Sequence, residues 1–133
     1  MKNKIIGIVL MSAILSAGCI LFGEHYTPQQ LLGYKLIDVV KNNNISEFQN
    51  LFANNVIEKF KERNEDFDVS LQKVLDKYRE KFFKRYKEFQ DSNFYFNYQG
   101  TETEGDLYIF FNEQRSAKKP IILENEEWVF NKL

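Results

Sequence analysis

The chain has 133 residues and a formal net charge of −1, from 18 lysines and arginines against 19 aspartates and glutamates. The length suits one domain with a hydrophobic core, and the near-neutral charge argues against a general nucleic-acid binder. One cysteine and one histidine leave no disulfide within the chain and no zinc site built from His and Cys. The sequence therefore predicts a small domain that holds no metal or other cofactor.

The N-terminal residues have the layout of a secretory signal, with Lys2 and Lys4 before an apolar stretch. Small residues follow this stretch and lead to the only cysteine, in the order Leu15, Ser16, Ala17, Gly18 and Cys19. The run resembles the signal of bacterial lipoproteins, which implies cleavage before Cys19 and lipidation of its thiol. Several acyl chains hold a protein stably at a bilayer, whereas a single chain binds only marginally. The resemblance therefore implies a protein that works at a membrane surface.

Three segments follow from this resemblance: a signal peptide at 1–18, a lipid-anchored tether at 19–26 and one domain at 27–133. The domain would lie on the extracytoplasmic side, in the periplasm or at the outer membrane. The alternative is an uncleaved helix over 5–22, which is at the short end for a hydrocarbon core of about 30 Å. Basic residues before that helix would stay in the cytoplasm, so a single-pass protein would also place its domain outside.

Capping signals mark the first two helices of the domain. Thr27, followed by Pro28 and Gln30, has the pattern of a capping box with proline at the first helical position. Asn42-Asn43-Asn44 is expected to end this helix. Ser46 to Gln49 has the pattern of a second capping box, which predicts a short helix beginning there.

Further helical turns are expected over 56–60, and Asn64 to Asp66 breaks the pattern. The longest helix is predicted from about Asp68 to Phe89. Its apolar residues recur at spacings of three and four, which indicates one buried stripe: Leu71, Leu75, Tyr78, Phe82, Tyr86 and Phe89.

After Gln90 the apolar residues alternate along the chain, which is typical of strands. Strands are predicted at four places: around 94–98, 107–111, 121–123 and 128–130. A polar turn is expected at 100–105, and a loop is expected at 115–119, ending at Pro120. Helices followed by an antiparallel meander define an α+β fold. We expect N-terminal helices, one of them long and amphipathic, packed on a C-terminal sheet of about four strands.

Two stretches resemble the nuclear-transport-factor-2-like (cystatin-like) fold, a cone that ketosteroid isomerase and many small secreted domains share. Val39 to Phe52 is similar to a helix, a short polar turn and a helix ending in Leu-Phe. Ile121 to Phe130 is similar to that family's closing hairpin, with a tryptophan just after the turn. The resemblance implies a curved sheet that can enclose a pocket. The sequence shows no strand between the second helix and the long helix, where it departs from this pattern.

Catalysis is not expected. His25, the only histidine, lies in the predicted tether, so Ser-His-Asp and Cys-His sites are excluded. In enzymes of the resembled fold an acidic residue in the cone works with a tyrosine or histidine. Here Glu102, Glu104 and Asp106 are expected in a solvated turn rather than in a site.

Three binding surfaces remain as candidates. A basic face of the long helix could contact an anionic surface such as lipid headgroups or an acidic partner: Lys73, Lys77, Lys81, Lys84 and Arg85. Its alternative interpretation is a solvated face stabilised by helical pairs such as Glu80 with Lys84. An apolar pocket between sheet and helices could be lined by Phe94, Phe96 and Tyr98, as in a small-molecule carrier. An exposed aromatic patch could bind a protein: Tyr95, Tyr108 and Phe110.

Taken together, the residues favour a non-catalytic, lipid-anchored binding or accessory lipoprotein of the cell envelope, of the immunity type for example. Its expected partners are the membrane, through acylated Cys19, and an envelope protein, with no nucleic acid. The alternative is a small-molecule carrier. An enzyme is the third hypothesis, and it requires a buried carboxylate with a raised pKa in a cavity.

Overall fold

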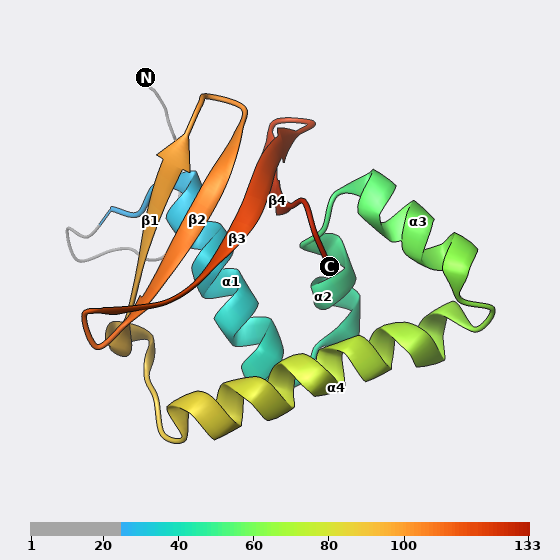
Figure 1. The fold of residues 1–133 in the computed structure, drawn as a ribbon, viewed down its shortest axis with the longest axis horizontal. Helices are drawn as coiled ribbons and strands as arrows, with labels where there is room; N and C mark the ends of the chain where they lie inside the picture. Colours follow the sequence, from blue (N-terminus) through green and yellow to red (C-terminus); the bar gives the residue numbers. More distant parts are fainter. Residues whose placement is uncertain (1–24) are drawn as a thin grey trace.

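The computed structural model describes residues 25–133, and the signal and most of the tether lie outside this range. Within it the chain forms helices first and then a four-stranded antiparallel sheet in the order β1-β2-β3-β4. Figure 1 shows the sheet beside α1, with the long helix α4 crossing one end of both. The predicted α+β class is therefore confirmed, including the long helix and the number of strands.

Four α-helices occupy the first part of the described chain: α1 (Pro28–Asn42), α2 (Ile45–Asn50), α3 (Asn54–Arg63) and α4 (Phe67–Tyr86). At the start of α1, the Thr27 hydroxyl accepts a hydrogen bond from the Gln30 amide, and the Gln30 side chain accepts one from the Thr27 amide. This is the capping box that the sequence predicted. Asn43 ends α1 in the left-handed conformation, with φ 54°.

Two predicted helix boundaries were wrong. The cap of α2 is Asn44 rather than Ser46, because the Asn44 side chain already accepts the Glu47 amide and starts the helix two residues earlier. The long helix ends at Tyr86 rather than Phe89, since Lys87 adopts a φ of 41° and takes the chain out of the helix. A short 3-10 turn at Asp91–Asn93 then leads into the sheet.

The four strands are β1 (Phe94–Gly100), β2 (Glu104–Phe111), β3 (Gln114–Glu124) and β4 (Glu127–Phe130). The loop predicted at 115–119 is wrong, because these residues form the first half of β3. The turn between β2 and β3 lies earlier, at Asn112-Glu113, and a matching turn at Asn125-Glu126 joins β3 to β4. All four turn residues have positive φ, between 50° and 70°, as two-residue hairpins require.

The core lies between the inner face of the sheet and the helices. The inner side chains of β1, β2, β3 and β4 include Phe96, Leu107, Ile121 and Phe130, each at most 1% exposed. Gly33 lets α1 approach β1 closely, because a Cβ there would come within 2.4 Å of the Phe96 ring. The segment at 51–53 pairs with the outer edge of β4: the Phe130 amide donates to the Leu51 carbonyl at 2.7 Å. This short pairing covers an edge that would otherwise be open.

Candidate functional site

Three aromatic side chains share the face of the sheet that lies opposite α1. Tyr95 of β1 is paired with Phe110 of β2, and Asn97 with Tyr108, so alternation directs Tyr95, Tyr108 and Phe110 to one side. The Tyr95 and Phe110 ring centroids are 5.9 Å apart. Tyr95 is 55% exposed, the most exposed large hydrophobic side chain among residues 25–133. The prediction that these three form one patch is confirmed in its geometry.

Cations from β3 frame this group. The guanidinium of Arg115 lies 5.3 Å from the centroid of the Tyr108 ring, and the ammonium of Lys118 lies 6.0 Å from it. Such contacts contribute roughly 0.5–1 kcal/mol at exposed sites and hold the ring in place. We call Tyr95, Tyr108, Phe110, Arg115 and Lys118 the open-face patch.

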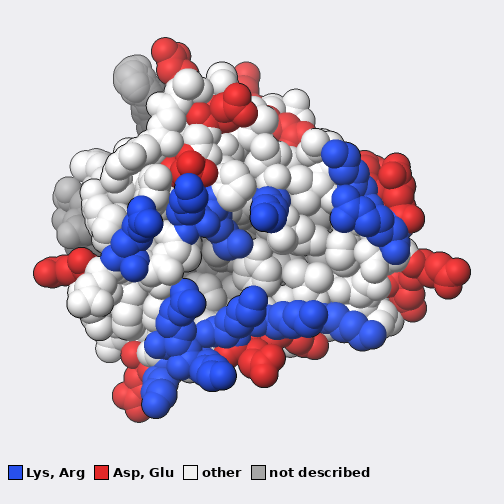
Figure 2. All heavy atoms as spheres, in the orientation of Figure 1, with Lys and Arg blue, Asp and Glu red and all other residues white. Residues whose placement is uncertain are grey.

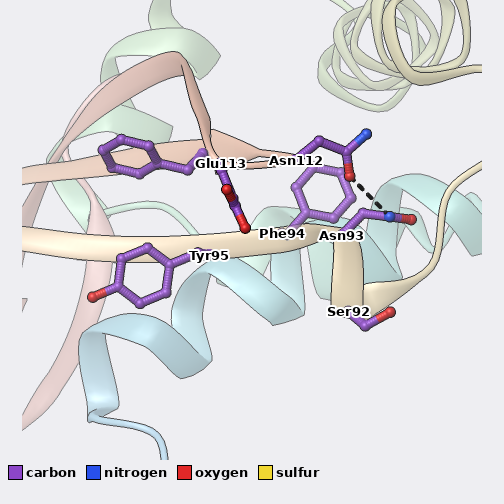
Figure 3. Close-up of a pocket in the computed structure, with 7 residues that line it drawn as sticks. Ser92, Asn93, Phe94, Tyr95, Asn112 and Glu113 are labelled. Atoms are coloured by element: carbon purple, nitrogen blue, oxygen red, sulfur yellow. Dashed lines mark hydrogen bonds between the residues drawn. The ribbon is translucent and has the colours of Figure 1, made fainter.

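A hollow of about 390 Å³ lies at the end of the patch near the β2–β3 turn. Its lining residues come from the 3-10 turn, β1 and the end of β2: Ser92, Asn93, Phe94, Tyr95, Phe110, Asn112 and Glu113. The Asn93 side-chain amide donates to Asn112 Oδ1 at 3.0 Å and joins its two sides. Figure 3 shows the carboxylate of Glu113 pointing across β1 and the Tyr95 ring turned outward. The hollow gives the patch a polar rim with both hydrogen-bond donors and acceptors.

The residues proposed to line an inner pocket lie elsewhere. Phe94 and Phe96 are 3% and 1% exposed, and their rings are 6.3 Å apart and nearly parallel within the core. Tyr98 is half-buried, with its ring 5.1 Å from Trp128, and its hydroxyl donates to the Thr101 carbonyl at 2.5 Å. Partial burial, followed by the nearby carboxylates, raises the pKa of Tyr98 above the usual value for tyrosine. The two phenylalanines therefore fill space between the sheet and α1, where a carrier would need an opening.

The five basic residues proposed on the long helix form one row along α4. Lys73, Lys77, Lys81 and Arg85 follow one another at four-residue steps, with Lys84 beside them, and all are exposed. Figure 2 shows basic side chains along α4 and over the sheet on one face of the molecule. We call these five residues the basic row. The prediction that they share a face is confirmed.

The basic row is joined to β3 by contacts at its borders. Arg85 Nη1 donates to the carbonyl and hydroxyl oxygens of Ser116, at 3.2 Å and 3.3 Å. The Ser116 hydroxyl is also hydrogen-bonded to the hydroxyl of Tyr86. Further along, Lys119 Nζ donates to the Tyr78 hydroxyl at 2.8 Å. The cations of α4 and those of β3 therefore belong to one continuous basic surface.

The alternative interpretation of the basic row as a solvated helix face stays open, since all five residues are exposed. Within residues 25–133, no carboxylate forms an ion pair with any residue of the basic row, including Glu80 with Lys84. Successive members repel one another instead, and like charges four residues apart in a helix destabilise it by roughly 0.2–0.5 kcal/mol per pair. The five cations of the row outnumber Asp76 and Glu80, the acidic residues beside them on α4, and this excess of positive charge is available to an external anionic group.

The remaining sequence predictions concern the lipid anchor, a membrane-spanning helix, a metal site and His25. Cys19 and the signal residues at 15–18 lie outside the described range. Among the described helices none is long and apolar enough to cross a membrane. No group of three or more His, Cys, Asp or Glu side chains in residues 25–133 could hold a metal ion. His25 is exposed at the beginning of this range.

Three cations of the sheet surface are not indicated by the sequence pattern. Arg115, Lys118 and Lys119 were expected in a loop, whereas β3 places the first two on the open face and the third against α4. The only available signal was Asn112-Glu113, since asparagine tolerates positive φ at a two-residue turn. Glu113 is a poorer indicator of such a turn than glycine, so the sequence gives no clear sign of this hairpin.

Comparisons with known proteins found no similar chain: no family model, no curated protein and no solved structure matches. The resemblances to a lipoprotein signal and to the nuclear-transport-factor-2-like fold therefore remain predictions from the sequence.

Proposed function

We propose that this protein is a lipid-anchored extracytoplasmic binding protein, without catalytic activity, that recognises a protein partner through its open-face patch. The main observation that supports this proposal is the exposure of Tyr95 beside Phe110 and Tyr108. Arg115 and Lys118 lie against the Tyr108 ring on the same face. Tyrosine and arginine are enriched among the residues that contribute most to protein–protein binding. The anchor is the acylated Cys19 implied by the lipoprotein resemblance.

The geometry favours this function over a small-molecule carrier. A carrier pocket needs space between the sheet and the helices, and the buried rings of Phe94 and Phe96 occupy it. The T-shaped contact between Tyr34 and Phe96, at 4.8 Å, packs the same region from α1. An open aromatic face with a shallow polar hollow suits a protein surface better than an enclosed ligand.

Photo-crosslinking in intact cells tests the proposal. A benzophenone amino acid replaces Tyr95 in one strain, and it replaces Val69, which is 51% exposed on α4, in a control strain. We expect a discrete adduct with one envelope protein from position 95, no such adduct from position 69, and loss of the adduct when Tyr108→Ala is added. The same adduct from both positions, or none from position 95, contradicts a binding role for the patch.

Intact-mass analysis tests the anchor separately. We expect a mature chain that begins at Cys19 and carries the mass of its acyl groups. A chain that retains residues 1–18 with an unmodified thiol contradicts the lipid anchor and favours the membrane helix at 5–22.

A further inference from the structure

The basic row of α4 has a composition suited to a diffuse anionic surface. Four of its five members are lysines, whose compact charges sit on flexible side chains. None of these four lysines forms a hydrogen bond or ion pair within residues 25–133. Sites that recognise one carboxylate or phosphate favour arginine, because the planar guanidinium binds both oxygens at once. In this surface the arginines Arg85 and Arg115 are engaged with Ser116 and with the Tyr108 ring. The lysines are thus the charges that remain available.

The reach of the tether is the second observation. Pro28 begins α1, and near the other end of this helix the Val40 carbonyl accepts a hydrogen bond from Arg79 of α4 at 2.9 Å. A helix rises about 1.5 Å per residue and is about 10–12 Å across, so the start of α1 lies about 18 Å from the near side of α4 and about 28–30 Å from its far side. About eight residue steps separate Cys19 from Thr27, and extended chain covers at most roughly 26–29 Å over that length. A tether close to full extension therefore just allows α4 to lie against the bilayer that holds the anchor.

We propose that the basic row of α4 docks on anionic lipid headgroups of the same bilayer that anchors the protein through Cys19. This inference rests on the lipid anchor of the proposed function. Anchoring keeps the row within reach of the headgroups, so individually weak attractions act together.

Lysine accessibility in lipid nanodiscs tests this docking. The acylated mature protein is reconstituted in neutral discs and in discs with about 30% anionic lipid, then treated with a membrane-impermeant acetylating reagent and analysed by mass spectrometry. We expect Lys73, Lys77, Lys81 and Lys84 to react about fivefold more slowly in anionic discs, and Lys35 of α1 to react equally in both. The difference should disappear in about 1 M NaCl, where the Debye length is about 3 Å.

Two variants separate docking from other causes of protection. In Lys77→Glu/Lys81→Glu, Lys73 and Lys84 should lose their protection in anionic discs. Deleting residues 20–24 leaves about three residue steps from Cys19 to Thr27, which span at most roughly 10–11 Å and prevent α4 from reaching the bilayer. That deletion should abolish protection, whereas replacing 20–24 by Gly and Ser of equal length should preserve it.

The outcomes distinguish the docking from the anchor on which it rests. Acylated protein whose α4 lysines react equally in neutral and anionic discs overturns the docking and leaves the anchor intact. Protection that survives the tether deletion overturns it as well. Protection by soluble polyglutamate without protection in anionic discs overturns it in favour of an acidic protein partner. An unmodified Cys19 refutes the anchor itself.

Discussion

The repulsion within the basic row leads to a prediction about stability. Lys77 has Lys73 four residues before it and Lys81 four residues after it, and no acidic side chain pairs with it within the described residues. Lys77→Glu replaces these two repulsive pairs by two attractive ones, and it turns the attraction to Glu80, three residues further on, into repulsion, each pair being worth roughly 0.2–0.5 kcal/mol. The net gain is about 0.4–1 kcal/mol, and solvent screening at an exposed site brings it to about 0.5 kcal/mol. Lys77→Gln removes these three interactions without reversing them and should gain about half as much.

Urea unfolding of the purified protein, followed by the fluorescence of Trp128, measures this gain. Trp128 is the only tryptophan and lies half-buried against Tyr98, so its emission reports on the sheet. The gain should be present at about 0.01 M salt, where the Debye length is about 30 Å, and nearly absent at about 1 M, where it is about 3 Å. Lys59→Glu of α3 is the matched control, because it gains a pair with Arg63 and loses one with Glu62.

A variant Lys77→Glu that is less stable than the natural protein at low salt would refute the reasoning. A gain that persists unchanged at high salt would also refute it, because the cause would then not be charge repulsion. If the gain is observed, the natural lysine lowers stability, which is expected of a residue kept for binding rather than for folding.

Three further predictions concern the fold. Gly33→Ala should lower the free energy of unfolding by about 1–2 kcal/mol in the same urea assay, because its Cβ would lie 2.4 Å from the buried Phe96 ring and overpacking outweighs the better helix propensity. The cost of Gly33→Ala should be smaller when it is measured in a Phe96→Leu background, and an equal cost in both backgrounds would locate it elsewhere. Thr27→Ala should cost about 1 kcal/mol by removing the cap of α1, and a stability equal to the natural protein's would show that the capping box contributes nothing. Partial burial, followed by the neighbouring carboxylate of Asp91, raises the pKa of Asp38. The contribution of Asp38 to stability therefore falls as the pH rises from its pKa in the unfolded state through its pKa in the folded state. Asp38→Asn should remove this decline, and an unchanged pH profile of unfolding would contradict the prediction.

The helices could be predicted because their signals are local. The bond between Thr27 and Gln30 spans three residues, so the sequence contains both partners of the cap that starts α1. The buried stripe of α4 follows from helical spacing alone, and it places Leu71 and Leu75 inside. Where the prediction was wrong, as at the start of α2, two neighbouring residues could serve as caps. Asn44 was then selected by its geometry rather than by its type.

The sheet could be predicted only in part, because its pairing joins residues that are distant in the chain. Alternation indicated β1 and β2, but the charged first half of β3 gave no such signal. Arg115 and Lys118 occupy strand positions because β2 supplies their hydrogen-bond partners. The pairing of Leu51 with Phe130 likewise depends on how α2 packs beside β4.

The sequence by itself determined the α+β order, the helices, the basic row of α4 and the position of the cysteine that a lipid anchor requires. Those features depend on residue type and on spacing within a few residues. Only the tertiary structure decided that Phe94 and Phe96 fill the interior, that Tyr95 remains exposed, and that the cations of β3 extend the basic row. Which side of a strand meets a helix, and which charges become neighbours, depends on the packing of distant segments, and no local pattern carries that information.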